Sequence, residues 1–292
     1  MPVLDAQVHS WYSDRPSRPW ESKYRSSNAH KQSYLQHAGQ TNSPEMVLAE
    51  MAEVDVDGAL LVPVGVYGTS MDLELDAAQQ YPERFQAICL IDHLDPALDH
   101  HLVAARDRGL RGVRILALRE PHRVARDEFE RALHLCADLG LVVATSLAHP
   151  LDPQLVELLR RHPGVFFYID HLGTGFAPPI LGFRPPAPFE HLASVLELAQ
   201  LPNVGLKLTG APALSYEAYP FRDIWGPVMQ LVRAFGADRV SWGSDFTRTA
   251  GLHSYWEGRY YLTEMPGFGD EQRTLLYGET LMLRTGWTPC PT

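Results

Sequence analysis

The sequence predicts a single α/β domain of the (β/α)8, or TIM-barrel, class. Three observations lead to this prediction: eight short apolar runs are spread along the chain, segments with helical spacing alternate with them, and 292 residues are enough for eight such units. A doubly wound open sheet would use fewer strands, and no G-x-G-x-x-G sequence follows the first run. We therefore expect residues 1–292 to form one barrel domain.

The predicted strands are short runs of apolar and β-branched residues. Most of them lack the alternation of a half-exposed strand, which indicates burial on both faces, as in a parallel sheet. In chain order they cover residues 2–8, 58–64, 85–91, 112–118, 141–147, 165–170, 203–208 and 239–244.

Segments with apolar residues at helical spacing lie between these runs. Two of them begin with a recognisable cap, because Ser43 precedes Pro44 and Asp152 precedes Pro153, and proline suits the first helical turn. Alternation of strand and helix predicts parallel β-α units. The predicted helices cover residues 44–54, 97–108, 127–139, 153–161, 189–198 and 224–235.

Long insertions follow the first and sixth predicted strands. Residues 10–42 are rich in Arg, Ser, His and Trp, and residues 174–188 are rich in Gly, Pro and Phe. Loops that follow barrel strands lie at the C-terminal end of the barrel, where barrel enzymes build their sites. We expect both insertions there, either as lids over the site or as subunit contacts of a homo-oligomer.

Charge and composition argue against several classes of partner. The chain has 35 Asp and Glu against 25 Lys and Arg, and this net charge of −10 repels a phosphate backbone, so no nucleic-acid partner is expected. The N-terminal residues lack the pattern of a signal peptide, and no run of about 18 apolar residues occurs, so no membrane partner is expected. Three separated cysteines without C-x-x-C spacing fit a reducing cytoplasm.

Polar residues gather at the C-terminal ends of four predicted strands. These ends meet on one rim of a parallel barrel, so the residues should lie close together. Imidazole and carboxylate groups serve as zinc ligands and as proton carriers, which indicates either a mononuclear divalent metal site or a metal-free acid–base cluster. The residues are Asp5, Gln7 and His9 on one side of strand one, His149 after strand five, His171 after strand six and Asp245 after strand eight.

For three of these positions, His149, His171 and Asp245, a functional role can be compared with a structural one. His149 lies in Ala-His-Pro and could simply end its strand. Neighbours on a strand face opposite sides, so only one of Asp170 and His171 should face the pocket; we expect His171 there and Asp170 as a loop anchor. Asp245 lies in a Gly-Ser-Asp turn where packing gives no reason for an acid, so it is the strongest catalytic candidate.

The strand-end motifs resemble those of a known family. The D-x-Q-x-H of residues 5–9, the I-D-H-L-G of residues 169–173 and the W-G-S-D of residues 242–245 resemble the amidohydrolase superfamily, and within it the amidohydrolase-2 branch of lactonases and non-oxidative decarboxylases. The resemblance covers nearly the whole chain. It implies catalytic roles for Asp245, His171 and His149, and a metal site drawn from His9, His171, Asp245 and Gln7.

Gln7 is a departure from the family pattern. It stands where the family has the first histidine of strand one, and an amide oxygen is a weaker zinc ligand than imidazole. No lysine follows strand four, so the bridging carboxylated lysine of two-metal members is missing. The resemblance thus implies one divalent metal, preferably zinc, or none.

Basic residues near the rim suggest the substrate class. Arg114 in strand four, Lys207 in strand seven and Arg248 after Asp245 could bind a carboxylate, and Trp11 could wall the pocket. A basic pocket in an acidic protein favours a small organic acid or a lactone as the small-molecule partner. Rim charges paired with acids, and aromatic residues packed against the barrel, are the structural alternatives.

The sequence therefore predicts a hydrolase that opens a small lactone, or a related C–O bond, by general-base activation of water. The alternative is a metal-dependent non-oxidative decarboxylase of an aromatic or muconate-like acid, which would use nearly the same residues. A barrel that has lost catalysis and acts as a scaffold is the third hypothesis, and a single departure from the motif pattern argues against it.

Overall fold

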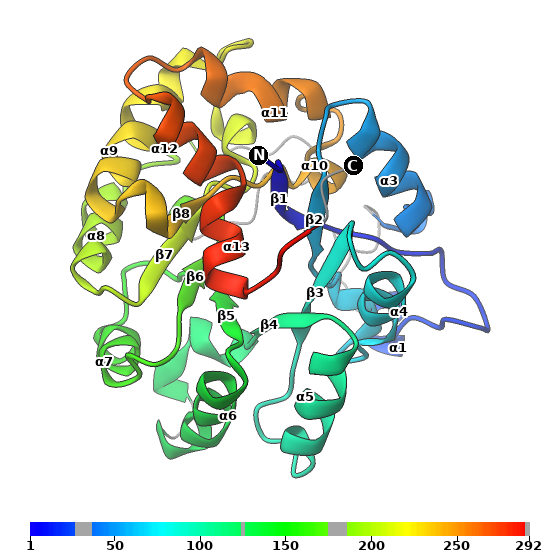
Figure 1. Ribbon diagram of the computed structural model, residues 1–292. Helices are drawn as coiled ribbons and strands as arrows, with labels where there is room; N and C mark the ends of the chain where they lie inside the picture. Colours follow the sequence, from blue (N-terminus) through cyan, green and yellow to red (C-terminus); the bar gives the residue numbers. More distant parts are fainter. Residues whose placement is uncertain (27–36, 124–125, 175–185, 290–292) are drawn as a thin grey trace.

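Eight parallel strands form the centre of the molecule. The computed structural model describes residues 1–26, 37–123, 126–174 and 186–289. Each strand pairs with the next along the chain, in the order β1 to β8, and Figure 1 shows helices around the outside of the strands. The strands are β1 (Leu4–Val8), β2 (Gly58–Leu61), β3 (Phe85–Leu90), β4 (Leu110–Arg114), β5 (Val142–Thr145), β6 (Phe167–Ile169), β7 (Val204–Lys207) and β8 (Val240–Ser241).

Hydrogen bonds across the seam bring the last strand back to the first. The backbone N–H of Ala6 donates to the carbonyl of Trp242 at 3.0 Å, and the N–H of Asp245 donates to the carbonyl of Gln7 at 3.1 Å. The predicted (β/α)8 barrel is therefore confirmed. The second half of the predicted strand 112–118 is wrong, because Leu116–Arg119 turns into a 3-10 helix after β4.

The six predicted helices are confirmed as α3, α5, α6, α7, α8 and α9. Both predicted caps are present: Ser43 accepts from the N–H of Met46, and Asp152 accepts from the N–H of Gln154. The described helices are α1 (Ser22–Ser26), α3 (Pro44–Ala52), α4 (Asp72–Gln80), α5 (Leu98–Asp107), α6 (Arg126–Leu139), α7 (Pro153–Arg161), α8 (Leu192–Glu197), α9 (Trp225–Phe235), α10 (Phe246–Thr249), α11 (Tyr255–Glu264), α12 (Asp270–Thr274) and α13 (Thr280–Thr285). None of these helices has the length and apolar character needed to cross a membrane.

Successive residues of the strands pack into two different apolar clusters. In β2, for example, Ala59 and Leu61 belong to the large cluster that includes apolar residues of the surrounding helices, whereas Leu60 belongs to a smaller one shared with other strands. Side chains on a strand alternate between its two faces, so the smaller cluster fills the barrel and the larger one joins strands to helices. Leu281 and Trp287 extend the smaller cluster with residues from the C-terminal segment.

The first insertion begins with a tightly held segment. Trp11 and Asn42 exchange two backbone hydrogen bonds of 2.8 Å, which ties the two ends of residues 10–42 together. The side chain of Trp11 is fully buried with Trp20, Val64 and Val66. Most of the second insertion, residues 174–188, lies outside the described residues.

The carboxylate of Asp5 lies buried at the seam between β1 and the segment after β8. It accepts from the N–H of Gln7 at 3.0 Å and from the N–H of Ser244 at 2.9 Å. The hydroxyls of Ser244 and Tyr255 also donate to it. Burial raises the pKa of Asp5 to about 6 even against these hydrogen bonds. One side chain therefore joins both strand ends that carry the main candidate residues.

We expect Asp5→Ala to lower the free energy of unfolding by about 3 kcal/mol, because buried backbone donors lose their acceptor. Asp5→Asn should cost less, since its amide oxygen can still accept from the N–H groups of Gln7 and Ser244. Urea denaturation of the three proteins measures the difference. Equal midpoints for Asp5→Ala and the wild type would contradict the role of this carboxylate at the seam.

A second buried acid, Glu74, lies on α4, and its side chain is almost fully inaccessible. Its Oε1 atom has no hydrogen-bond partner among the described residues. Burial raises the pKa of Glu74 from 4.5 to about 8. The folded chain therefore keeps the proton over a pH range in which the unfolded chain loses it.

Stability should therefore fall as pH rises from about 4.5 to about 8, since the unfolded state releases this proton first. Glu74→Gln cannot ionise, so its free energy of unfolding should rise relative to that of the wild type by up to roughly 5 kcal/mol across that range and stay constant above it. Unfolding midpoints at several pH values test this, with Glu53→Gln at an exposed position as the matched control. A difference that does not change with pH would contradict it.

Candidate active site

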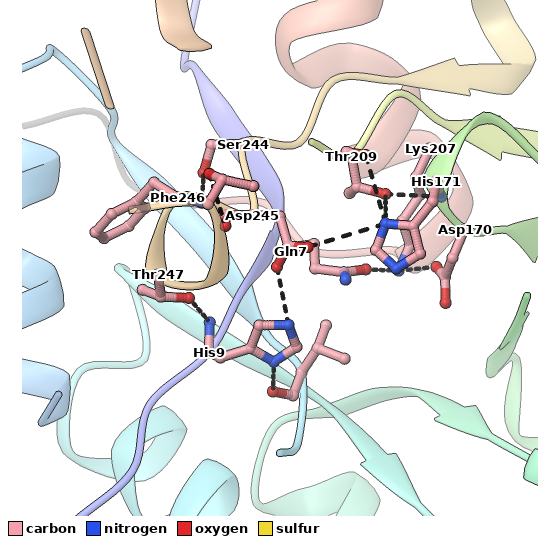
Figure 2. Close-up of polar contacts among 12 residues, drawn as sticks. Gln7, His9, Asp170, His171, Lys207, Thr209, Ser244, Asp245, Phe246 and Thr247 are labelled. Atoms are coloured by element: carbon pink, nitrogen blue, oxygen red, sulfur yellow. Dashed lines mark hydrogen bonds and ion pairs between the residues drawn. The ribbon is translucent and has the colours of Figure 1, made fainter. Parts of the chain in front are cut away.

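The C-terminal ends of β1, β6, β7 and β8 bring the candidate residues together. Figure 2 shows the carboxylate of Asp245 between the rings of His9 and His171, with Asp170 and Lys207 on the side of His171. All five side chains are buried. The cluster of polar residues that the sequence predicts at this end of the barrel is therefore present.

Asp245 and His9 form the closest pair. Asp245 adopts a left-handed backbone conformation with φ 53°, and its Oδ1 atom lies 2.9 Å from Nε2 of His9. The other ring nitrogen of His9 lies 2.7 Å from the carbonyl oxygen of Val62. A carbonyl only accepts, so Nδ1 of His9 carries the hydrogen, and the lone pair of Nε2 faces the carboxylate when the ring is neutral.

The environment keeps Asp245 ionised. Burial alone would raise the pKa of Asp245, but the charge and hydrogen bond of His9, followed by the charges of Arg248 and His171, outweigh it and lower the pKa. Burial lowers the pKa of His9 despite the charge of Asp245. A carboxylate and an imidazole lone pair in contact need a proton or a cation between them.

Two polar groups of Thr209 contact Nδ1 of His171. The backbone N–H of His171 donates to the Thr209 hydroxyl at 2.9 Å, and that hydroxyl lies 3.1 Å from Nδ1 of His171. Nδ1 also lies 3.4 Å from the carbonyl oxygen of Thr209, so the hydroxyl and the carbonyl of this residue both contact the same ring nitrogen. Burial lowers the pKa of His171 to about 4, so the ring is neutral at neutral pH. Its Nδ1 atom lies 3.9 Å from Oδ2 of Asp245.

The expectation that Asp170 is a loop anchor turned away from the pocket is wrong. Asp170 forms ion pairs with Arg114 at 2.5 Å and with Lys207 at 2.9 Å, inside the ring of strands. Burial would raise the pKa of Asp170, but Arg114 and Lys207 outweigh it and lower the pKa below its ordinary value. Alternation places Asp170 on the same inner face as Tyr168, and His171 also turns inward because the chain leaves β6 after Ile169 and His171 takes a positive φ of 52°. Both side chains therefore reach the site.

The amide of Gln7 faces the same two cations. Its Oε1 atom lies 3.3 Å from Nζ of Lys207 and 3.5 Å from the guanidinium of Arg114. Both neighbours are donors only, so the atom beside them is the oxygen. The Nε2 atom of Gln7 is buried and has no hydrogen-bond partner among the described residues. The amide therefore presents a free donor, and the oxygen that a metal would need is already engaged.

Arg114 and Lys207 are not free charges. Each is paired with Asp170, and Lys207 is completely buried, whereas Arg114 keeps about 8% of its surface exposed. Arg248, in the short helix α10 after Asp245, is half-buried. Burial lowers the pKa of Arg248, and the charge of Asp245 opposes this.

His149 and Trp11 contact the loops around the site. Nε2 of His149 lies 2.7 Å from the carbonyl of Gly173, and its ring stacks on His191 with the centroids 4.2 Å apart. His149 thus contacts the loop that follows β6. The indole N–H of Trp11 donates to the carbonyl of Gln40 at 2.8 Å, so this side chain fixes the first insertion.

Trp11 also forms one wall of a pocket of about 390 Å³ between the first insertion and the segment after β8. Phe246, Thr247 and Tyr255 line the same pocket. The N–H of His9 donates to the hydroxyl of Thr247 at 3.1 Å, so the pocket adjoins the His9 and Asp245 pair.

The buried groups fit a divalent cation only in part. Nε2 of His9 and both carboxylate oxygens of Asp245 lack a hydrogen-bond partner among the described residues. A metal-binding histidine usually donates its other N–H to a carbonyl, as His9 does to Val62. Gln7 does not fit as a ligand, and Nδ1 of His171 contacts Thr209. Three ligand groups within 4.8 Å of one another occur elsewhere in the described chain, at Glu130, His134 and His162, and these could hold a divalent metal.

Sequence reasoning missed Thr209. It lies two residues after Lys207, so alternation along strand seven places both side chains on one face. A hydroxyl near a strand end carries little signal by itself, and its role depends on the backbone turn at His171, which is distant in sequence. The same holds for the carbonyl of Val62, since a backbone group leaves no mark in the sequence.

Comparison with curated proteins identifies relatives with named activities. A 4-sulfomuconolactone hydrolase of Hydrogenophaga intermedia is 27% identical over 232 residues, which are 77% of this chain and 69% of the relative. An L-fucono-1,5-lactonase of Burkholderia ambifaria is 42% identical over 105 residues, which are 34% of this chain and 33% of the relative.

Comparison with solved structures supports the fold. An amidohydrolase from Burkholderia multivorans, described with bound zinc, superposes with a TM-score of 0.77 at 20% identity, over 99% of this chain and 100% of that chain. A family model described as Amidohydrolase matches residues 4–279. The resemblance of the strand-end motifs is thereby confirmed, and the chain belongs to the amidohydrolase family.

Proposed function

We propose that this enzyme hydrolyses a small lactone that carries a negative charge. The observation that carries the proposal is the pairing of an ionised, buried carboxylate with uncommitted donors across the same site. Asp245 supplies the base, while Nε2 of His171 and Nε2 of Gln7 supply the donors. The relatives named above are hydrolases of lactones, which supports this chemistry.

Asp245 acts as the general base in this scheme. It removes a proton from water as the water oxygen attacks the lactone carbonyl carbon, and it returns that proton to the ring oxygen as the C–O bond breaks. The product is one hydroxy acid, so atoms and charge balance without a further reactant. The lowered pKa of Asp245 keeps the carboxylate ready at neutral pH.

His171 and Gln7 stabilise the carbonyl oxygen as negative charge develops on it. In this scheme neutral His171 carries its hydrogen on Nε2 while Nδ1 accepts from the Thr209 hydroxyl, and the amide of Gln7 has a buried hydrogen-bond donor free. Donors that are held in place before the reaction contribute the most to this kind of stabilisation. When a divalent metal, preferably zinc, is bound, His9 and Asp245 would hold it, and it would polarise the same carbonyl.

The charges around the site favour an anionic substrate. Before the histidines are counted, Arg114, Lys207 and Arg248 face the two carboxylates Asp170 and Asp245, which leaves one excess positive charge. Arg114 is the partly accessible member of the pair at Asp170, so we assign substrate binding to Arg114 and Arg248. Lys207, which is buried, then orients Asp170 and Gln7 through its contacts with both side chains.

His149 and Trp11 take supporting roles in this proposal. His149 would position the loop after β6 through the carbonyl of Gly173, and Trp11 would shape the neighbouring pocket. The decarboxylase alternative needs a metal to hold the substrate, and loss of Gln7 as a ligand leaves only His9 and Asp245 well placed for it.

Replacing the base tests the proposal directly. Asp245→Asn should lower kcat on a panel of anionic lactones by at least roughly 10³-fold, because proton transfer is lost while the shape is kept. Base consumption in a weakly buffered pH-indicator assay measures the rate, and circular dichroism checks the fold. A folded variant that keeps more than a tenth of the wild-type rate would exclude Asp245 as the base.

Replacing the proposed amide donor gives a second test. Gln7→Met keeps the volume but removes the donor, and it should lower kcat by about 10² with a smaller change in KM, since the donor acts on the transition state. Metal content should not change, because the Gln7 oxygen already accepts from Lys207 and Arg114. An unchanged kcat would rule out the donor role, and a loss of bound metal would restore Gln7 as a ligand.

A further inference from the structure

Three potential metal ligands meet on the outside of the barrel, away from the strand ends described above. Glu130 and His134 lie one turn apart on α6, and His162 follows α7; Figure 1 shows these two helices as neighbours. One ligand atom of each residue lies within 4.8 Å of the others. None of the three takes part in the proposed lactone hydrolysis.

The spacing of the ligand atoms suits zinc. Oε2 of Glu130 lies 3.3 Å from Nε2 of His162 and 4.0 Å from Nε2 of His134. Zinc bonds of about 2.0–2.2 Å at tetrahedral angles place ligand atoms roughly 3.3 Å apart. The two histidine rings stand at 65° with their centroids 5.6 Å apart, so both nitrogens can face one ion without stacking.

An ion pair holds Glu130 in place. Arg161 pairs with Oε1 of Glu130 at 3.0 Å, which leaves Oε2 to face both histidines. His162 is about 94% buried, and its Nε2 atom makes no hydrogen bond of good geometry within the described residues, although Glu130 is near. A buried nitrogen aimed at a carboxylate with its hydrogen-bonding capacity unused points to a cation as the third partner.

The backbone of His162 is fixed as well. The side-chain amide of Asn203 donates to the carbonyl oxygens of Leu159, His162 and Val165 at 2.9, 3.0 and 3.2 Å. This amide closes the segment between α7 and β6 against the start of β7. A ligand held on a rigid backbone loses little freedom when it binds metal.

We propose that Glu130, His134 and His162 form a zinc site that clamps α6 to the end of α7. His162 lies shortly before β6 begins, so the site is near the N-terminal ends of the strands, opposite the end that carries Asp245. In barrels the N-terminal end serves stability rather than catalysis. The fourth zinc position is left to water, and the role of the ion is structural. This proposal does not depend on lactone hydrolysis.

Zinc chloride alone is the probe for this site. Metal-stripped full-length protein is incubated with zinc, freed of unbound ion by gel filtration and assayed for zinc by elemental mass spectrometry, and its unfolding midpoint is measured with and without zinc. His134→Ala is the test variant, because His134 is exposed and its loss leaves the core intact. His100→Ala, an exposed histidine on α5, is the matched control, and Asp245→Asn separates this site from the strand-end site.

We expect zinc to raise the unfolding midpoint of the wild type by several degrees, through binding to the folded state. His134→Ala should bind one zinc fewer per chain and lose most of that rise, with unchanged turnover, while His100→Ala should match the wild type. Asp245→Asn should retain this zinc. Equal zinc content and equal midpoints in His134→Ala and the wild type would overturn the proposal, as would loss of all zinc in Asp245→Asn.

Discussion

The buried carboxylate of Asp5 is the constraint on which the candidate site depends. It accepts backbone N–H groups from Gln7 in β1 and from Ser244 after β8, so one anion ties the two strand ends together. His9 lies two residues beyond Gln7, and Asp245 follows Ser244 directly. The distance between the ring of His9 and the carboxylate of Asp245 is therefore set at the seam of the barrel. The shortest strand, β8, has two residues, and its own ladder could not fix that distance alone.

The barrel can be predicted because strand and helix patterns repeat along the chain, whereas side-chain directions beyond the strand ends cannot be predicted from such repeats. Short apolar runs and capped helices recur along the chain, so the eight strands, the six helices and the shared rim could all be predicted from sequence. Alternation allowed only one of Asp170 and His171 in the pocket, and His171 was chosen. The prediction failed because Asp170 continues the inner face of Tyr168, while the left-handed turn at His171 brings that side chain inward as well. Asp245 takes a left-handed turn as well, and its inward position was predicted from its chemistry rather than from the strand period.

Gln7 shows why a side chain's role cannot be assigned from residue type alone. An amide offers one acceptor and two donors, and sequence comparison presents it only as a poor substitute for a histidine ligand. Two cations, Lys207 and Arg114, lie on one side of it and can only donate. They fix the oxygen toward themselves and leave the nitrogen facing the site. The residues that decide the orientation lie 107 and 200 positions away in the chain, so no local pattern could contain this information.

Buried polar groups without a hydrogen-bond partner occur at both ends of the described barrel, and they mark the two sites proposed above. At the C-terminal end, Nε2 of His9, both oxygens of Asp245 and the amide nitrogen of Gln7 lack hydrogen bonds among the described residues. Each such buried group costs about 1–3 kcal/mol in the folded state, and that cost is recovered when substrate or a cation binds. At the other end, Nε2 of His162 is likewise unsatisfied, while the amide of Asn203 holds the backbone around it. A zinc clamp between α6 and α7 would add stability at the end where rigidity does not hinder catalysis, and so offset the unsatisfied groups at the site.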